Sequence, residues 1–142
     1  MTLFLCAQDL EWFWLGLIRD ESFFVLERVT APPERYLSEL HRFLHAHGWK
    51  PEDLAGVSVV RGPGSFTASR VSLTLANTLH FAFRIPLHIL ANPDSLAPAE
   101  LLARHGVGEQ LSVGTFAAPF YSGPARITVP KAGDKALDTA GI

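Results

Sequence analysis

The stretch VSVVRGPGSFT, residues 57–67, contains a glycine turn that could form a binding or catalytic site. A turn of this kind between a strand and a helix can present backbone N–H groups and the positive end of the helix to an anion. It is no P-loop, because the lysine is missing, and no dinucleotide-binding turn, because Thr67 stands where the third glycine would be. A nucleophile elbow would need glycine two residues to either side of its serine, and Ser65 has Pro63 and Thr67 there.

Two interpretations of this turn remain open. In the first, the turn binds an anion through five residues, namely Arg61, Gly62, Gly64, Ser65 and Thr67. In the second, steric interpretation, which the pattern favours, the turn serves only the fold. Gly64 allows two backbones to approach closely, and Ser65 or Thr67 caps the helix that follows.

Two histidines are the next candidates for chemistry. His41 and His45 stand four residues apart on an expected helix, which is the spacing of two metal ligands on one face. A third ligand is not evident, so we expect no metal site. The order of residues gives no Ser–His–Asp group, no paired carboxylates and no Cys–His cluster. We therefore expect no catalytic residue and no cofactor.

The elements that position these residues follow from the hydrophobic pattern. Strands are expected at residues 2–6, 13–18, 23–29, 57–60 and 86–90, and more weakly at 111–116 and 125–129. Helices are expected at residues 34–47, 66–83 and 93–104. The first helix should bury one stripe, made of Tyr36, Leu37, Leu40, Leu44 and His47. Three strands with short links, followed by alternating helices and strands, predict an α/β fold with a mixed sheet.

The helix at residues 66–83 has an unusual outer face, because residues 71–83 contain no Asp, Glu, Lys or Arg. At 100° per residue, one face suits packing on the sheet: Val71, Leu75, Ala76, Leu79, Ala82 and Phe83. The opposite face is uncharged and partly apolar: Leu73, Thr74, Asn77, His80 and Phe81. An exposed helix normally turns charged residues to water. We therefore expect another subunit to cover this face, with the tail of the chain as the alternative.

Composition is typical of a globular protein. The chain has 142 residues, of which 48% are hydrophobic, and a formal net charge of −2. This length suits one domain with a small appendage, and the balanced charge does not indicate binding to nucleic acid or an anionic membrane. The single cysteine, Cys6, cannot form an internal disulfide, and Asp9, Glu11 and Arg19 interrupt the apolar start of the chain. We therefore expect a cytoplasmic protein without a membrane span.

The stretch VVRGPGSFTASRVSLTLANTLHFAFRIPL, residues 59–87, closely resembles the signature of the TsaB/YeaZ family. The resemblance extends more loosely over residues 1–103, through the segments ERYLSEL and PEDLAGV. It implies a ribonuclease-H-like half of the actin, Hsp70 and sugar-kinase superfamily. The mixed five-strand sheet would have the order 3-2-1-4-5, with helices on both faces. Residues 1–105 would form this domain, and residues 106–142 a short remnant of the second lobe with a loose tail.

The same resemblance implies a function. The chain would be a non-catalytic partner subunit in the synthesis of threonylcarbamoyladenosine at position 37 of certain tRNAs. It would act with a TsaD-like catalytic subunit, with a TsaE-like ATPase in the wider complex, and would meet tRNA only indirectly. Independently of the resemblance, the uncharged outer face of the helix at residues 66–83 predicts a homodimer. The expected interface residues are Arg70, Leu73, Thr74, Asn77, His80 and Phe81.

Departures from the family pattern argue against catalysis. The family's first strand usually ends in Asp-Thr-Ser, where this chain has Ala7-Gln8-Asp9. Asn92 and Leu96 stand where catalytic relatives have a His-x-x-x-His metal motif. The usual second half is reduced to a tail, so a nucleotide cleft between two full lobes is not expected. Two alternatives remain: a nucleotide- or phosphate-binding protein that uses residues 61–67, or a degenerate paralogue that only self-associates.

Overall fold

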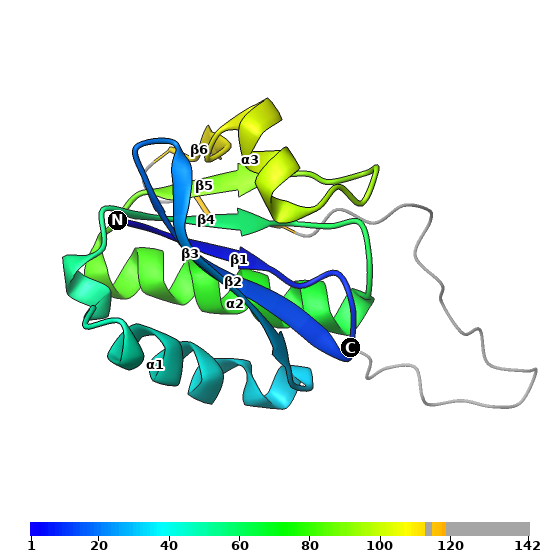
Figure 1. Ribbon diagram of the computed structural model, residues 1–142, viewed down its shortest axis with the longest axis horizontal. Helices are drawn as coiled ribbons and strands as arrows, with labels where there is room; N and C mark the ends of the chain where they lie inside the picture. Colours follow the sequence, from blue (N-terminus) through cyan, green and yellow to red (C-terminus); the bar gives the residue numbers. More distant parts are fainter. Residues whose placement is uncertain (113–114, 119–142) are drawn as a thin grey trace, which may run out of the picture.

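A computed structural model describes residues 1–112 and 115–118 of the chain, and these form one mixed sheet with helices on both faces (Figure 1). The strands are β1 (Thr2–Cys6), β2 (Trp12–Arg19), β3 (Ser22–Thr30), β4 (Gly56–Val60), β5 (Leu87–Leu90) and β6 (Glu109–Gln110). The α-helices are α1 (Tyr36–Ala46), α2 (Phe66–Phe83) and α3 (Pro98–His105), and short 3-10 turns are η1 (Pro33–Arg35) and η2 (Pro51–Asp53). None of the described helices combines the length and hydrophobicity of a membrane span.

The strand order is β3-β2-β1-β4-β5-β6. The first three strands form an antiparallel meander, and β1, β4 and β5 run parallel to one another. The predicted order 3-2-1-4-5 is therefore confirmed. The short strand β6 adds an antiparallel edge beyond β5, which the sequence analysis did not expect.

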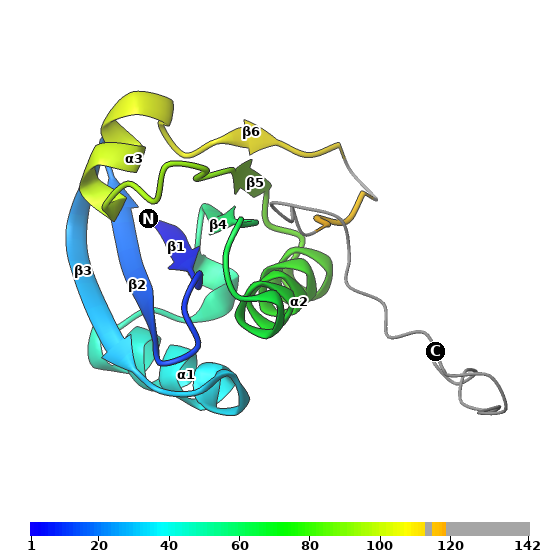
Figure 2. The same ribbon diagram turned by 90° about the vertical axis from the view of Figure 1, so that its right-hand side faces the viewer.

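The two faces of the sheet have separate hydrophobic cores. Helices α1 and α2 cover one face and α3 the other (Figure 2). Alternation along β1 sends Leu3 and Leu5 into the first core, whereas Phe4 and Cys6 enter the second. Helices on both faces explain why the parallel strands are apolar throughout, as in β4, where all five residues are buried.

Several predicted boundaries were wrong. In α1, Leu37 is 65% exposed, and Phe43 is buried on the packing stripe instead. Helix α3 begins at Pro98 rather than near residue 93, because Asn92 binds the backbone of Leu96 and holds the preceding residues in a turn. The described residues between 111 and 116 are not strand, although the Leu111 N–H still donates to the carbonyl oxygen of Leu87 in β5 at 2.9 Å. The predicted strand at residues 125–129 and the predicted loose tail lie outside the described residues.

Helix α2 packs on the sheet through a face that matches the predicted one only in part, at Ala76 and Leu79. Its buried residues are Ala68, Ser69, Ser72, Leu73, Ala76 and Leu79. Leu73, which the sequence analysis placed on the partner-binding face, is only 2% exposed and belongs to the core. Ala82 and Phe83, expected against the sheet, are exposed. The small side chains let the helix lie close to β4, which leaves the bulkier Val71 and Leu75 only partly buried.

Candidate functional site

The glycine turn joins β4 to α2 and passes directly over the loop after β1. A Cβ atom added at Gly64, where φ is +152°, would lie 2.7 Å from the backbone oxygen of Gln8. The backbone N–H of Ser65 donates to that same oxygen at 2.9 Å. Two backbones therefore approach closely here because residue 64 lacks a side chain. This confirms the close approach that the steric interpretation predicts.

Ser65 is the N-cap of α2. Its Oγ accepts a hydrogen bond from the backbone N–H of Ala68 at 3.2 Å, which satisfies one of the free N–H groups of the first turn. Thr67 is exposed and is not the cap. The helix start therefore already has a protein acceptor at the place where an anion would bind. The anion site remains a prediction.

Two amide side chains close the space around the turn. Gln8, after β1, donates from Nε2 to the carbonyl oxygen of Pro63. Asn92, after β5, donates from Nδ2 to Gln8 Oε1 at 2.9 Å, and its backbone N–H donates to the carbonyl oxygen of Gly62 at 2.9 Å. Asn92 is 1% exposed, and its Oδ1 accepts from the backbone N–H of Leu96 at 2.8 Å. The loops after β1, β4 and β5 are thus tied together by amides.

The sequence analysis missed this role of Gln8 and Asn92 and treated both only as departures from a family motif. One signal was available. Each is a polar residue within two positions of the carboxyl end of a parallel strand, where such residues meet at one edge of the sheet. Arg61, in the same region, is partly buried, and its backbone N–H donates to the carbonyl oxygen of Leu90 at 2.9 Å.

The histidine pair lies on α1. The rings of His41 and His45 stack with centroids 6.3 Å apart. Within residues 1–112 and 115–118, no group of three or more His, Cys, Asp or Glu residues is arranged to hold a metal ion.

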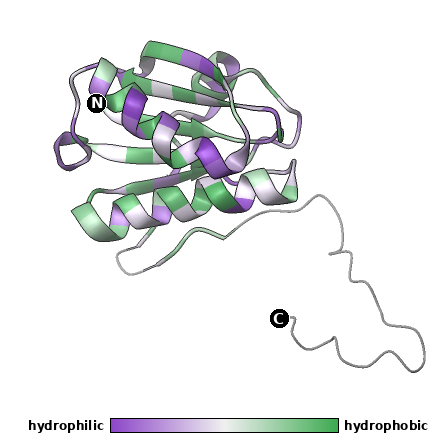
Figure 3. Cartoon of the chain, turned by 90° about the horizontal axis from the view of Figure 1, so that it is seen from below, coloured by the Kyte–Doolittle hydropathy of each residue, from purple (hydrophilic) through white to green (hydrophobic). Residues whose placement is uncertain are grey.

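The predicted partner-binding face of α2 is partly open. Arg70 and Thr74 are exposed, and the Arg70 guanidinium lies 5.3 Å from the ring centroid of Phe66. Phe81 is 74% exposed, the largest exposed fraction among the large hydrophobic residues described. In Figure 3, α2 is mainly green and pale, whereas α1 carries several strongly hydrophilic residues.

Two other predicted interface residues already have partners within the chain. Asn77 exchanges two hydrogen bonds with the backbone of Ala117, from Nδ2 at 3.1 Å and to Oδ1 at 2.8 Å. His80 donates from Nδ1 to the carbonyl oxygen of Ile85 at 2.6 Å. The segment after β6 therefore crosses the outer face of α2, and Phe116 lies 6.3 Å from Phe81 between ring centroids. The alternative cover, the chain itself, therefore takes up part of this face, and the rest is exposed; cover by another subunit remains a prediction.

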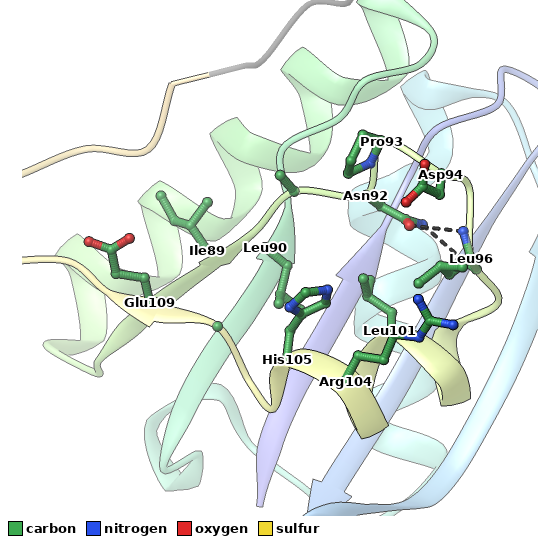
Figure 4. A pocket seen from close by; sticks show the side chains of 12 residues that line it. Ile89, Leu90, Asn92, Pro93, Asp94, Leu96, Leu101, Arg104, His105 and Glu109 are labelled. Atoms are coloured by element: carbon green, nitrogen blue, oxygen red, sulfur yellow. Dashed lines mark hydrogen bonds between the residues drawn. The ribbon is translucent and has the colours of Figure 1, made fainter.

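A hollow of about 540 Å³ lies between the end of β5 and α3 (Figure 4). His105 and Leu101 from α3 face Leu90 from β5, and Asp94 and Arg104 also line the hollow. Arg104 pairs with Glu100 at 2.8 Å on the exposed side of α3. The lining mixes apolar side chains with charges of both signs, so it selects no single ligand chemistry.

Burial rather than charge controls the titration of the inner groups. Burial raises the pKa of the Cys6 thiol from its ordinary 9.0 to about 12, so the thiol stays neutral and is no nucleophile. Burial also lowers the pKa of His88, against a smaller opposite effect of a backbone hydrogen bond with Gly108. Within the described residues, burial and a backbone contact account for both pKa shifts, and no titratable neighbour contributes to either.

The fold and the turn define the class of this protein. A mixed sheet of this order, with α1 and α2 on one face and α3 on the other, is a ribonuclease-H-like α/β half-domain. Its glycine turn is tied to the carboxyl ends of the neighbouring strands by Gln8 and Asn92.

Comparison with known proteins narrows the class to a family. The family model described as "TsaD: tRNA N6-adenosine threonylcarbamoyltransferase" matches residues 33–110, more than half of the chain. The tRNA threonylcarbamoyladenosine biosynthesis protein TsaB of Bacillus subtilis (strain 168) is 35% identical over 87 residues, a match that covers 58% of this chain and 38% of that protein. The chain therefore belongs to the family of this model, and its predicted TsaB/YeaZ character is confirmed.

Solved structures agree on the fold. One is YeaZ from Pseudomonas aeruginosa, and another is described as an uncharacterized protein with similarity to the peptidase YeaZ, from the same organism. Each is 21% identical to this chain with a TM-score of 0.56, over 64% of this chain and 43% of its own length. The chain spans less than half the length of each of these relatives.

Proposed function

We propose that this chain is a non-catalytic partner subunit in the synthesis of threonylcarbamoyladenosine in tRNA. In this proposal it binds a TsaD-like catalytic subunit, belongs to a wider complex with a TsaE-like ATPase, and meets tRNA only through these partners. The pathway is proposed from the family match and from the identity to TsaB. Its place of action would be the cytoplasm. Residues 1–105 would supply the binding domain.

The exposed aromatic surface of α2 carries the proposal. Phe81 is 74% exposed and Phe116 is 58% exposed, and they lie together on a helix side without charged residues after Arg70. Exposed, uncharged aromatic surface of this kind is typical of protein interfaces. The partner surface is centred on Phe81, with Arg70 and Thr74 towards the start of the helix. Leu73 has no part in it, because it is buried.

The side chains that follow the carboxyl ends of β1 and β5 support a non-catalytic role. Gln8 and Asn92 occupy the carboxyl edge of the sheet and bind the backbone of the glycine turn and each other. Neutral amides can neither exchange a proton at neutral pH nor hold a metal as carboxylates and imidazoles do. The chain therefore contributes binding surface rather than reacting groups.

Capture of the partner tests this function. The purified chain is mixed with the TsaD-like subunit from the same host, and the complex is measured by co-elution and by the rate of tRNA modification. The double variant Thr74→Asp with Phe81→Asp should lose the complex, whereas Leu37→Asp, which alters the 65%-exposed Leu37 on α1, should retain it. Buried like charges at an interface cost several kcal/mol. The proposal is wrong if the unaltered chain neither binds the subunit nor changes the rate of modification.

A further inference from the structure

A hollow of about 270 Å³ lies where the carboxyl end of β1 meets the segment before α3. Its walls are Gln8 and Asp9 from the loop after β1, Trp12 and Trp14 from the start of β2, and residues 95–98. In Figure 1, β1 and β5 point to the same edge of the sheet, where the segment that leads to α3 begins. Ligand pockets typically have about 300–1,000 Å³, so this hollow suits a small molecule. We call it the tryptophan hollow.

Two indole rings lie on the same side of the sheet at this hollow. Side chains alternate along a strand, so Trp12 and Trp14 lie on the α3 side, whereas Phe13 between them is buried in the core under α1 and α2. Both tryptophans are only partly buried. Packing within the chain therefore leaves aromatic surface for a ligand.

One of these rings already binds a cation. The guanidinium carbon of Arg28 lies 4.3 Å from the ring centroid of Trp12, in a cation–π contact. Arg28 itself does not line the hollow. Within the part of the chain that the structure describes, no cation lies over the ring of Trp14. The Trp14 ring is therefore available to a cation from outside the chain.

The lining of the hollow is negatively charged. Asp9 lines it, and none of the described residues around it is Lys, Arg or His. The Oδ1 atom of Asp9 accepts from the backbone N–H of Glu11 at 2.8 Å, and no basic side chain among the described residues pairs with this carboxylate. Pro98, the first residue of α3, has no backbone N–H to offer an anion. The hollow therefore favours a positive ligand over a negative one.

We propose that the tryptophan hollow binds a small organic cation of the quaternary ammonium class. Its positive group would lie against the indole of Trp14 and near the Asp9 carboxylate, and its methyl groups against the apolar side chain of Leu96. Indole faces attract such cations, which need no hydrogen-bond acceptor for each methyl group. A metal ion would instead need several oxygen ligands, and the described residues provide no such group.

This site is independent of the proposed function. It lies on the α3 side of the sheet, whereas the proposed partner surface lies on α2. Failure to bind a cation would leave the capture of a TsaD-like subunit unaffected, and the converse also holds.

Choline and its neutral carbon analogue, in which a tert-butyl group replaces the trimethylammonium group, test the site. The two molecules have the same shape and differ in charge. Each is titrated into the full-length chain at constant ionic strength, and binding is measured by calorimetry and tryptophan fluorescence. Two of the three tryptophans line the hollow, whereas Trp49 packs against the core on the other face. Choline should show saturable binding, at least about tenfold tighter than that of the neutral analogue.

Two variants locate the binding. Asp9→Asn removes the charge but keeps an oxygen that can accept from the Glu11 N–H, so it should fold normally and weaken choline binding at least about threefold. Trp14→Leu removes the ring and should weaken it at least about fivefold. The matched control Asp53→Asn, at an exposed position of η2, should leave the affinity unchanged. Thermal unfolding establishes that each variant is folded.

Three results would overturn the inference. The first is the absence of saturable choline binding to the unaltered chain. The second is equal affinity for choline and the neutral analogue, because the charge would then have no part in recognition. The third is an equal effect of Asp9→Asn and Asp53→Asn, because choline would then bind elsewhere or only through the overall charge of the chain.

Discussion

Two amide side chains, Gln8 and Asn92, determine how the carboxyl ends of the parallel strands fit together. An amide both donates and accepts, so one side chain can satisfy the backbone of several loops at once. Asn92 uses both functions, donating to Gln8 Oε1 and Leu96 O while accepting from the Leu96 N–H. Because Asn92 is 1% exposed, water cannot replace these partners. The edge of the sheet is therefore held by neutral polar groups.

Replacing Asn92 by Leu should lower the free energy of unfolding by about 3 kcal/mol. The variant leaves the Leu96 N–H without its acceptor and Gln8 Oε1 with the weak Cys6 thiol donor in place of the Asn92 amide, and each buried unsatisfied group costs roughly 1–3 kcal/mol. Urea denaturation measures the change. The control Asp94→Leu alters an exposed residue of the same loop and should change stability by less than about 0.5 kcal/mol. Equal losses in both variants would contradict this account of the network.

The buried thiol of Cys6 should make stability fall at alkaline pH. Burial raises its folded pKa from 9.0 to about 12, so the unfolded chain releases this proton first as pH rises. The stabilising contribution is complete below pH 9 and is lost as pH rises from 9 towards 12; the loss is about 3 kcal/mol by pH 11. Urea denaturation at pH 8 and pH 11 measures it. Cys6→Ala should show a smaller pH-dependent loss, and an unchanged slope would refute the assignment.

Helix α2 illustrates what the sequence determines at the scale of an element. Its limits, residues 66 and 83, were predicted correctly, because a strand, a glycine turn and a capping serine precede its first residue. Its packing face was predicted only in part, at Ala76 and Leu79. Hydrophobic periodicity placed the bulky Val71 and Leu75 against the sheet, yet the closest contacts are made by small residues such as Ala68 and Ser72. Periodicity measures side-chain hydrophobicity, whereas the closest packing depends on side-chain volume.

In the candidate site, too, some features could be predicted from the sequence and others could not. The steric turn could be predicted, because close backbone approach and capping depend on residues adjacent in the sequence. The bonds of Gln8 and Asn92 could not, since they join residues 84 positions apart. The coverage of Asn77 by Ala117 depends in the same way on where the chain returns after β6. Long-range contacts of this kind carry no local pattern.

The turn between β4 and α2 should be intolerant of a side chain at Gly64. In Gly64→Val the new Cβ would lie 2.7 Å from a backbone oxygen, and a β-branched residue is strained at positive φ. Gly48→Val is the matched control, because φ is +75° there but nothing lies within 4 Å. The control should cost about 1–2 kcal/mol, and Gly64→Val at least about 2 kcal/mol more. Equal thermal and urea stability of the two variants would contradict the close approach.

At the scale of the molecule, the two sides of the sheet differ in what they leave exposed. The α3 side has a hollow with charges of both signs, including Asp94 and Arg104. The α2 side has exposed aromatic residues, notably Phe66, Phe81 and Phe116. A formal net charge of −2 opposes close contact between two copies only weakly. Association is therefore expected through the α2 side.

We expect the isolated full-length chain to form a symmetric dimer centred on Phe81. In a two-fold arrangement the same patch meets itself, so the aromatic residues of both copies would bury one another and any substitution would act twice. Phe81 lies in the last turns of the helix, beyond the hollow over its first half that Phe66, Arg70 and Thr74 line. Sedimentation at micromolar concentrations measures the equilibrium.

The variants that test partner capture also test this dimer. Thr74→Asp with Phe81→Asp should weaken self-association at least about 100-fold, since buried like charges cost several kcal/mol and each 1.4 kcal/mol is tenfold. Leu37→Asp removes an exposed apolar side chain from α1 and should leave the dimer intact, which separates a specific interface from general stickiness. A wild-type chain that sediments as a monomer at high micromolar concentration would refute the dimer. The exposed rings of Phe81 and Phe116 would then remain for a different subunit, and capture of the TsaD-like protein would decide between these partners.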